Sequence, residues 1–479
     1  MTTTPPAASG ASKWGRCYNG NSMPPTASEV LADHFVGLAA GDIPQKLIED
    51  AKTLVLDYLG VALAGSQTDS GRISRRFVVE TGGQPDATLI GDGRRVPAVH
   101  AALANAISSH SVELDDVDVL ALFHFSPPVV SAALAVAERE HSSGTEFIAA
   151  VAAGCEMMAR ASAATNPSLR DRGFHTTPTC GVFGATIAAA RLLKLDRDAT
   201  VSALGLAGAQ ASGLMEMYGP SMQKRFNPGP SARNGVTAAL MARLGFTGAA
   251  TIFDGERSFC RAFSDRFDLA ELTKGLGRDY PVFMEFKPYS CARPIHNAID
   301  CALTIRAELA EPLSQARAIT VRRHPAWANY HQNAEPKTYH EAQVSLPYSV
   351  AVALIEGAAL LPQYQQEKLI DPDILRLARM VKVLPDETLP RGVSCLMTLE
   401  TAGGGVYRSQ VDHPRGSIAN PMTAEEMSRK MHMLADGVIG RASVDALADA
   451  VRNVTALPRI DELARLFGGA LASTGVAGG

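Results

Sequence analysis

The chain has 479 residues, which is more than one hydrophobic core usually organises, so we expect two domains or one large domain with a substantial second layer. Hydrophobic residues make up 46% and charged residues 20%, and the net charge is −4 with no long run of either sign. This balance indicates neither a nucleic-acid-binding surface nor a polybasic membrane face. Charged residues such as Glu138, Glu156 and Arg191 interrupt every apolar stretch, so we expect no membrane span and no membrane or nucleic-acid partner.

Seven cysteines are scattered along the chain with no C-x-x-C pair. Their number and spacing fit neither a zinc ribbon nor a disulfide framework, and they show no recognisable ligand pattern for an iron–sulfur cluster. We therefore expect buried free thiols in a reducing compartment, a cytoplasmic location and no bound metal.

The N-terminal part of the chain reads as a tail followed by many helices. Residues 1–27 are rich in Thr, Pro, Ala, Ser and Gly and lack an apolar core segment, so we predict a disordered tail and no secretory signal. Residues 47–64 carry apolar side chains at three- and four-residue steps and end at Gly65, which predicts an amphipathic helix with a glycine cap. Similar patterns predict helices at 97–109, 127–140, 145–163, 181–194, 198–213 and 231–244. The segment 181–194 is apolar almost all round, so we place it in the middle of a helical bundle.

Near residue 284 the pattern changes from helices alone to helices mixed with strands. Alternating segments predict strands at 317–323, 394–400 and 406–411, the last two joined by a hairpin turn at 402–405, and helical patterns cover 292–310, 340–357 and 363–380. We therefore predict a smaller α+β domain over 284–419.

After Pro421 the chain returns to helix, with Thr423 and Glu426 as a capping box and a second helical run at 443–453. We expect residues 420–479 to rejoin the helical domain formed by 28–283. The predicted fold class is thus mainly α, a large all-helical domain plus a smaller α+β lid domain.

The densest polar segment is 110–118, where His110 precedes four carboxylates and His124 follows soon after. Three interpretations stay open: a solvated acidic loop, a metal site, or a general acid–base centre in which carboxylates and histidines shift one another's pKa values. The segment lacks the spacing of a calcium loop and has no His pair at i, i+4. The carboxylates are Glu113, Asp115, Asp116 and Asp118.

Two later loops each lead into a helix and carry residues that suit an anionic ligand. His175 precedes an Ala-rich helix, whose positive N-terminal end attracts anions and resists protonation of an imidazole. The loop at 224–235 places Lys224 and Arg225 before the next helix, for which we predict Ser231 as the N-cap. In both loops the alternative is a purely structural turn.

Residues 285–296 lie at the predicted domain boundary, where small-molecule clefts commonly form, and include Lys287, Tyr289, Arg293 and His296. The chain contains no G-x-G-x-x-G opening a helix after a strand, no Walker G-x-x-x-x-G-K-[ST] and no G-x-S-x-G elbow. Dinucleotide, nucleotide and serine-nucleophile enzymes are therefore disfavoured.

The order and spacing of these motifs resemble the MmgE/PrpD family, which includes 2-methylcitrate dehydratase, cis-aconitate decarboxylase and iminodisuccinate epimerase. The matching motifs are Leu-Asp-Tyr-Leu-Gly (56–60), His-Ser-Val-Glu-Leu-Asp-Asp (110–116), Gly-Phe-His-Thr-Thr-Pro-Thr-Cys-Gly-Val-Phe-Gly (173–184), the loop at 224–235, Lys-Pro-Tyr-Ser-Cys (287–291), Glu-Ala-Gln-Val-Ser-Leu-Pro-Tyr (341–348) and Asn-Pro-Met-Thr (420–423). The resemblance implies a helical domain capped by an α+β lid, a homodimer, a small di- or tricarboxylate substrate and no redox cofactor.

By motif match, the resemblance also implies the site residues. A proton removed next to a carboxylate leaves charge that needs a positioned base and waiting cations. His175 is the first choice for proton transfer, with His124 and Asp115 positioning it or acting as a second acid or base. The implied catalytic set is His175, His124, Asp115, Lys224, Lys287 and Tyr348, and the implied substrate-binding set is Glu113, Asp116, Arg225, Arg293 and His296.

Two departures from the family pattern bear on the reaction. Relatives commonly carry Thr or Tyr and then a nearby His where this chain has Val117 and Asp118, and His124 is followed by Phe125 in place of Pro. The leading hypothesis is a cofactor-independent lyase that removes water or carbon dioxide from a small di- or tricarboxylate. The alternatives are an epimerase that uses the same proton chemistry and a carboxylate-binding protein without catalysis.

Overall fold

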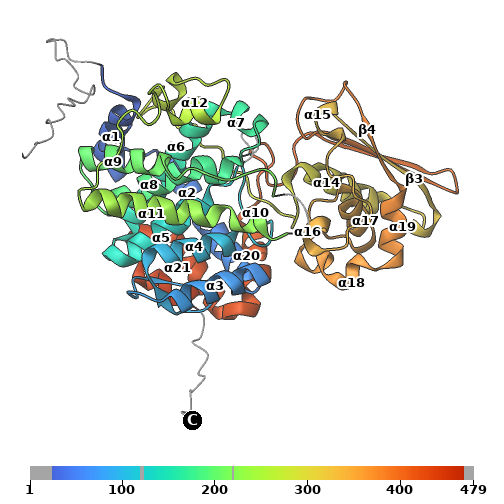
Figure 1. Cartoon of the computed structure of the whole chain (residues 1–479). Coiled ribbons are helices and arrows are strands. Elements are labelled where there is room, and N and C mark those ends of the chain that lie inside the picture. The colour runs from blue at the N-terminus through green and yellow to red at the C-terminus, as the bar shows by residue number, and fades with distance from the viewer. Residues whose placement is uncertain (1–23, 119–122, 218–220, 469–479) are drawn as a thin grey trace, which may run out of the picture.

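The computed structural model describes residues 24–118, 123–217 and 221–468, and shows a large helical domain beside a smaller domain (Figure 1). The predicted tail lies outside the described residues as far as residue 23. Helix α1 (Ala27–Gly37) begins where the tail was expected to end. Thr26 caps it, accepting a hydrogen bond from Glu29 N at 3.3 Å while Glu29 accepts one from Thr26 N at 2.7 Å.

The helical domain is built around α4 (Ala98–Ser109), α5 (Ser126–Glu140), α6 (Gly144–Thr165), α8 (Thr176–Leu192) and α11 (Pro228–Arg243). Small residues let these helices approach closely. A Cβ on Gly184 would lie 2.6 Å from Gly154 O, so α6 and α8 meet almost backbone to backbone. The central position predicted for 181–194 is confirmed, because nearly all of α8 is buried.

The remaining elements of this domain surround those helices. A two-stranded hairpin pairs β1 (Ala87–Thr88) with β2 (Arg95–Val96). The other helices are α2 (Gln45–Ser66), α3 (Asp69–Thr81), α7 (Ser168–Asp171), α9 (Arg197–Gly208), α10 (Gln223–Phe226), α12 (Phe259–Phe263), α13 (Ala270–Thr273), α20 (Ala424–Ile439), α21 (Arg441–Arg452) and α22 (Asp461–Phe467).

The C-terminal helices pack on the N-terminal ones. Met431 of α20 and Leu447 of α21 belong to the same hydrophobic core as Leu54 of α2. Lys430 of α20 pairs with the buried Asp57 of α2 and donates to Leu114 O at 2.7 Å. The last part of the chain thus supports the loop that follows α4.

The smaller domain has its own hydrophobic core, between a four-stranded sheet and helices. The strand order is β4-β3-β5-β6, with β3 parallel to β4 and antiparallel to β5, and Ile319 of β3 lies opposite Val381 and Leu399. The elements are α14 (His296–Glu308), β3 (Ala316–Arg323), α15 (Pro325–Ala328), α16 (Tyr339–Ala342), α17 (Leu346–Glu356), α18 (Gln366–Leu369), α19 (Pro372–Met380), β4 (Val381–Pro385), β5 (Cys395–Thr401) and β6 (Val406–Val411).

The structure confirms the predicted fold class and corrects several elements in this domain. The helical pattern at 340–357 divides into α16 and α17, because Ser345 caps a new helix by accepting from Tyr348 N at 3.1 Å. The pattern at 363–380 divides before Pro372, which opens α19. Strand β4 was not predicted, because it follows α19 without a break and gains its hydrogen bonds only from β3.

Among the described residues, α6 alone has the length and apolar composition of a membrane span, which corrects the expectation that charges interrupt every candidate. Of its most apolar window, 94% is buried inside the protein, as in the core helix of a folded domain. The six described cysteines are free and buried, as predicted.

Candidate active site

A cavity of about 60 Å³ lies where the helical domain meets the smaller domain. Its lining holds four cations, one carboxylate and three histidines. Most of these residues come from the helical domain and the segment that leaves it, whereas Trp327 and His331 come from the smaller domain. The lining residues are Glu113, Val117, His124, Arg170, His175, Lys224, Lys287, Ala292, Arg293, Pro294, Trp327 and His331.

Glu113 holds the cations of this cavity together. The chain leaves α4 at His110 and turns through Glu113, whose φ of 57° lies in the left-handed region that a non-glycine residue rarely adopts. Its buried carboxylate accepts hydrogen bonds from Lys224 and Arg225, and Lys287 Nζ lies 3.4 Å from Oε1. One carboxylate thus faces three cations, which leaves the cluster with net positive charge.

The charges in this cluster shift one another's pKa values. Burial opposes ionisation of Glu113, but Lys224, Lys287 and Arg225 outweigh it and hold the pKa of that carboxyl well below its usual range. Burial, together with repulsion from Arg225 and Lys287, lowers the pKa of Lys224 to about 8 despite Glu113. Burial also disfavours the charge of Lys287, but Glu113 and Asp115 raise its pKa above the ordinary value.

Asp115 joins two histidines behind this cluster. Its Oδ2 lies 2.7 Å from His110 Nδ1 and 3.1 Å from His124 Nδ1, and Lys287 Nζ is 3.6 Å from Oδ1. Burial opposes ionisation of Asp115, but His124, His110 and Lys287 hold its pKa well below the usual range. His110 is fully buried, and burial lowers its pKa to about 4. The Nδ1 atom of His124 is directed to Asp115 and Asp116 O, so Nε2 is the nitrogen left for a ligand.

Among the described residues, His110, Asp115 and His124 also form a possible metal-ligand set, because their ligand atoms lie within 4.8 Å of one another. In the observed arrangement, Nδ1 of each histidine faces Asp115, and Lys287 lies beside that carboxylate. This hydrogen-bond network and the nearby positive charge suit an ionised acid–base group better than a divalent cation. The predicted absence of a metal stays a prediction.

Asp116 lies beside this network but serves the backbone. Its two carboxylate oxygens accept hydrogen bonds from Phe125 N at 2.8 Å and Ser126 N at 3.0 Å, at the start of α5. It does not line the cavity. The structure therefore places this predicted substrate-binding residue as a helix cap.

The two departures from the family pattern have clear positions. Val117 lines the cavity and forms a short antiparallel bridge with Glu285, with N–O distances of 2.9 and 3.0 Å. Asp118 forms a similar bridge with Phe123, whose ring packs edge-on against the ring of Phe125. Both departures therefore shape the loop that carries His124.

His175 occupies the N-cap position of α8, as predicted, and faces the same cavity. Burial and the neighbouring His110 and Lys224 lower its pKa well below the usual range, so its ring is neutral at physiological pH. Asn227 Nδ2 donates to His175 Nδ1 at 3.1 Å, and in this arrangement Nε2 carries the proton. His124 N is held from the same helix, because it donates to Thr177 Oγ1 at 3.2 Å.

Ser231 is not the N-cap of the following helix. Helix α11 begins at Pro228, three residues earlier, and Ser231 Oγ is buried without a hydrogen-bond partner within the described chain. The Pro-Gly-Pro sequence, which we interpreted as loop, instead forms the first turn of the helix, where proline is favoured.

Two predicted binding residues support the wall of the cavity, Arg293 within the lining and Arg225 just behind it. Arg225 donates to Gln343 Oε1 at 2.8 Å as well as to Glu113. Arg293 donates to Glu285 Oε2 at 3.0 and 2.8 Å, to Arg415 O at 2.9 Å and to His296 Nδ1 at 3.1 Å.

His296 lies behind that wall. With Nδ1 accepting from Arg293, its Nε2 donates to Cys291 O at 3.2 Å. Both nitrogens are thus occupied, and the ring does not line the cavity. His296 fixes the orientation of Arg293.

The structure corrects the placement of Tyr348 in the catalytic set. Its ring is fully buried in the core of the smaller domain, 5.8 Å from the ring of Tyr364, and its hydroxyl donates to Gln363 O at 2.7 Å. Helix α17 begins only two residues earlier, at Leu346, and the turn from its cap directs Tyr348 into that core. Tyr348 does not line the cavity.

Two ionisable residues that line the cavity, His331 and Arg170, were not among the residues predicted from the sequence. His331 has a φ of 66°, and Nδ1 donates to Val344 O at 3.0 Å, which leaves Nε2 as an acceptor. Burial lowers its pKa to about 4. Its hydrogen-bond partner, Val344, lies more than a dozen positions later in the chain. Only the unusual density of His and Tyr in 330–340 therefore indicates from the sequence that His331 has a functional position.

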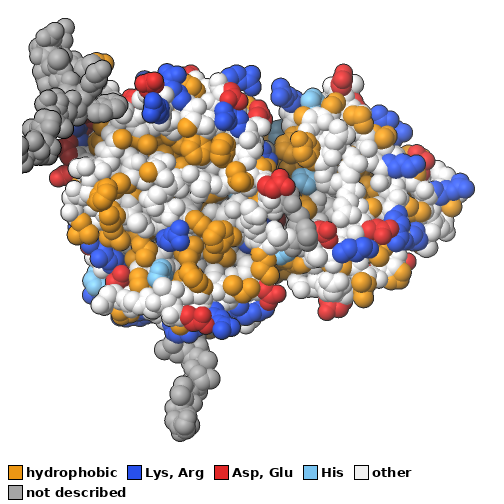
Figure 2. All heavy atoms as spheres, viewed as in Figure 1, with side chains coloured by type: hydrophobic (Ala, Val, Ile, Leu, Met, Phe, Trp, Pro, Cys, Tyr) orange, Lys and Arg blue, Asp and Glu red, His pale blue; other side chains and the backbone are white. Residues whose placement is uncertain are grey.

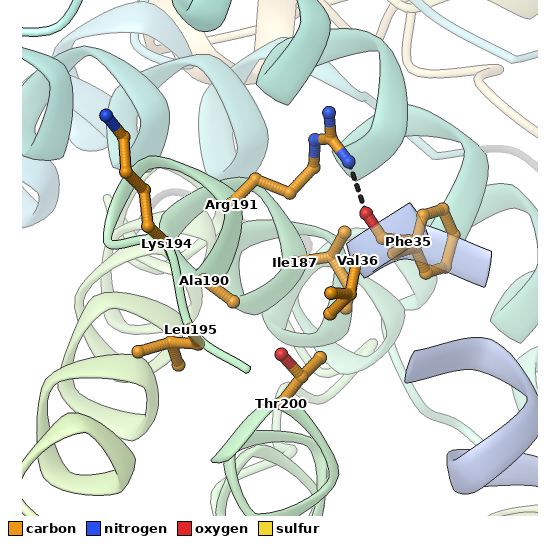
Figure 3. A pocket seen from close by; sticks show the side chains of 8 residues that line it. All are labelled: Phe35, Val36, Ile187, Ala190, Arg191, Lys194, Leu195 and Thr200. Carbon is orange, nitrogen blue, oxygen red and sulfur yellow. Dashed lines mark hydrogen bonds between the residues drawn. The ribbon is translucent and has the colours of Figure 1, made fainter. Parts of the chain in front are cut away.

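A second, larger cavity of about 270 Å³ lies elsewhere, between α1, α8 and the start of α9 (Figure 3). Its polar groups are Arg191, Lys194 and Thr200, and most of the other lining is apolar. Arg191 donates to Phe35 O and, at 2.8 Å, to Leu38 O, so it ties the C-terminal end of α1 to α8. Its described lining contains no histidine or carboxylate, so we interpret this cavity as a structural junction between α1 and α8.

Comparison with known proteins gives two family matches that together cover most of the chain. The MmgE/PrpD N-terminal domain matches residues 29–272, and the MmgE/PrpD C-terminal domain matches residues 289–455.

Three curated relatives align over nearly their whole length. A cis-aconitate decarboxylase-like protein, oryM, of Aspergillus oryzae is 27% identical over 471 residues, covering 92% of this chain and 97% of that protein. A cis-aconitate decarboxylase of Aspergillus terreus is 28% identical over 466 residues, covering 90% and 93%. The cis-aconitate decarboxylase of Homo sapiens is 24% identical over 459 residues, covering 92% and 94%.

Proposed function

The chain belongs to the MmgE/PrpD family, and from that premise we propose that it is a lyase that removes carbon dioxide or water from a small polycarboxylate. The observation that carries the proposal is the cavity in which Lys224 and Lys287 share one carboxylate, Glu113, beside His124 and His175. Its excess of positive charge suits a substrate with several carboxylates. The names of the relatives make cis-aconitate the first substrate to test.

We propose that Lys224 and Lys287 bind carboxylates of the substrate. Each ammonium has three hydrogen-bond donors, and Glu113 occupies only part of this capacity. Both side chains are buried, so a bound carboxylate meets them in a low-dielectric setting where charge attraction is strong. They stabilise the negative charge that develops next to a carboxylate during the reaction.

The two histidines suit different proton-transfer roles. Asp115 Oδ2 lies 3.1 Å from His124 Nδ1 and orients the ring so that Nε2 is left for a ligand, so His124 is the proposed acid, with Nε2 as the atom that gives the proton. His175 is held neutral with its proton on Nε2, so it is the proposed hydrogen-bond donor to the substrate. This assignment reverses the first choice made from sequence, in which His175 was the main proton-transfer group.

Decarboxylation needs an acid at carbon. When the carbon–carboxylate bond breaks, carbon dioxide leaves and its electron pair shifts through the adjacent double bond of the substrate. The carbon at the far end of that double bond, next to another carboxylate, then takes a proton from His124 Nε2. Solvent returns one proton to His124 for each carbon dioxide released. Dehydration uses His124 differently, because neutral His124 Nε2 removes a proton from carbon and then gives that proton to the departing hydroxide, which leaves as water.

A substrate panel tests the proposal. Purified protein, treated with a chelator, is incubated separately with cis-aconitate, citrate and methylcitrate, and the products are followed by NMR. We expect loss of carbon dioxide or water from at least one of them. If every substrate is returned unchanged, the lyase proposal fails. Binding without turnover would then favour a non-catalytic carboxylate-binding protein, and exchange of a carbon-bound proton without loss of mass would favour an epimerase.

We also propose that the protein is a homodimer. Hydrophobic side chains gather on the face of the helical domain where α11 lies in front (Figure 2). Leu244 is 83% exposed, and Met241 and Phe246, close to it along the chain, are also exposed. Exposed apolar patches of this kind mark interaction surfaces. Light scattering coupled to gel filtration should give twice the chain mass, and Leu244→Glu should lower it.

A further inference from the structure

The cations around the catalytic cavity differ in whether a carboxylate of the protein already neutralises them. Lys224 and Lys287 face Glu113. Arg293, also in the lining, is fully occupied by Glu285 and its other acceptors. Arg225, just behind the lining, is bound to Glu113 and Gln343. These four side chains have fixed positions before any substrate arrives.

Arg170 is different. It lines the cavity from α7 and is partly buried, yet its side chain makes no hydrogen bond or ion pair with any residue in 24–118, 123–217 or 221–468. Its backbone is well held, because Gly173 N donates to Arg170 O at 2.9 Å and Ser168 Oγ accepts from Asp265 N at 2.9 Å. A fixed backbone therefore presents an unpaired guanidinium to the cavity. Placing such a cation beside other cations is unfavourable unless an anion joins it.

The position of Arg170 also shows where a substrate can extend. A neighbouring cavity of about 380 Å³ is lined by apolar residues, including Ala159, Pro281 and Phe283, and by the polar residues Asp118, Ser162, Asn166 and Arg170. Arg170 is the one described residue that lines both cavities. The catalytic cavity, at about 60 Å³, holds only about four or five water positions. A substrate larger than that space has room to extend past Arg170.

We propose that Arg170 binds a substrate carboxylate separate from those held by Lys224 and Lys287, and thereby selects tricarboxylates over dicarboxylates. The inference rests on the proposed function, because it assumes that the two lysines hold the other carboxylates. The guanidinium of arginine presents two parallel N–H groups that match the two oxygens of a carboxylate. The third carboxylate lies on the arm of the substrate that points toward the neighbouring cavity.

The contribution of Arg170 is measured best with ligands that do not react. Tricarballylate is a saturated tricarboxylate, and glutarate is a dicarboxylate of similar backbone length. A charge-assisted hydrogen-bond pair of this kind changes affinity by about 10- to 100-fold. We therefore expect Arg170→Gln to weaken tricarballylate binding by that factor in isothermal titration calorimetry, and to change glutarate binding less than about threefold.

Two further variants make the comparison specific. Arg172→Gln removes a nearby arginine that is exposed and paired with Asp265, so it should leave both affinities unchanged. Arg170→Lys keeps the charge but loses the two-pronged geometry, so its tricarballylate affinity should fall between wild type and Arg170→Gln. A matching circular-dichroism spectrum and melting temperature show that each variant is folded.

The binding results for Arg170→Gln either support or overturn the proposed role of Arg170. Selective loss of tricarballylate binding in Arg170→Gln supports the proposal. Equal losses for both ligands, or no loss for either, overturn it and leave Arg170 as a general positive charge or a solvent-facing side chain. If the wild-type protein binds neither ligand, the proposed function itself fails, and this result is distinct because it appears before any substitution is made.

Discussion

Replacing Glu113 by Gln tests whether one buried carboxylate organises the site. The substitution keeps the shape of the side chain but removes the charge that faces Lys224, Arg225 and Lys287. Removing one partner of a buried ion pair typically costs about 3–5 kcal/mol, because the remaining charges stay buried without compensation. At the Lys287–Oε1 distance of 3.4 Å, the attraction lost at an effective dielectric constant near 20 is about 5 kcal/mol, which agrees with that range.

The expected change in melting temperature follows from the length of the chain. The unfolding entropy of about 2.1 cal/mol/K per residue gives about 1 kcal/mol per degree for 479 residues unfolding together. Glu113→Gln should therefore lower the melting temperature by about 3–5 °C when no ligand is present. Tricarballylate should recover part of this loss, because its carboxylates supply the missing negative charge.

The matched control is Glu335→Gln, which removes an exposed carboxylate that pairs with Arg379 at 2.7 Å. This exposed pair is screened by water, so its loss should move the melting temperature by less than about 1 °C. Differential scanning calorimetry measures both variants. A shift below about 1 °C for Glu113→Gln would refute the account of Glu113 as the common counter-ion.

Three further predictions concern the charge of a lysine, the two histidines and the packing beneath the site. Lys224 is mostly charged only below its pKa of about 8, so kcat/KM should fall as pH rises through about 8. Lys224→Arg should move that fall to higher pH, because the guanidinium keeps its charge. An unchanged pH profile of kcat/KM would exclude Lys224 as the titrating group. His124→Gln should lower the kcat of decarboxylation by about 10²- to 10⁴-fold, because it removes the proposed acid. His175→Gln removes one neutral hydrogen bond and should lower kcat by about fivefold. The opposite order of effects would reverse the assignment of the acid. A Cβ on Gly65 would lie 1.8 Å from Ser108 O, so Gly65→Ala should lower the free energy of unfolding in urea by at least about 1–3 kcal/mol. Gly437 has open space around it, so Gly437→Ala should raise that free energy by about 0.4–1 kcal/mol. Similar effects of the two substitutions would show that the α2–α4 crossing is not tightly packed.

The helices of the large domain were predictable because their signals are local. The predicted helix at 97–109 corresponds to α4, and the one at 127–140 to α5, with ends that differ by one residue. The capping box at Thr423 and Glu426 is confirmed, because Glu426 N donates to Thr423 Oγ1 at 3.2 Å. Periodicity, caps and glycines act over a few residues and can be read directly from the sequence.

The arrangement of the site was not predictable in the same way, because its contacts join distant parts of the chain. Glu113 pairs with Lys224, which is 111 positions later, and with Lys287, which is 174 positions later. The sequence identified these residue types as candidates, but it did not distinguish Asp116, which caps α5, from Asp115, which holds His110 and His124. Only the packing of the loop decides which carboxylate faces which partner.

Residues outside the recognisable motifs were missed for a related reason. Arg170 lies two positions from Arg172, and nothing in the sequence shows that Arg172 pairs with Asp265 while Arg170 faces the cavity. Tyr348 lies within a motif, but the start of α17 turns it into a different core. A motif match locates a segment, whereas the direction of each side chain depends on tertiary structure.

In the proposed reaction, the protein's own acid delivers a proton to carbon as carbon dioxide leaves a polycarboxylate, or to the departing hydroxide as water leaves. The most direct test is turnover of cis-aconitate in deuterium oxide, followed by proton and carbon NMR. The account predicts one carbon-bound deuterium in the product for each carbon dioxide released, and loss of this product in His124→Gln. Deuterium in recovered substrate with no loss of carbon dioxide or water would contradict the account and identify an epimerase.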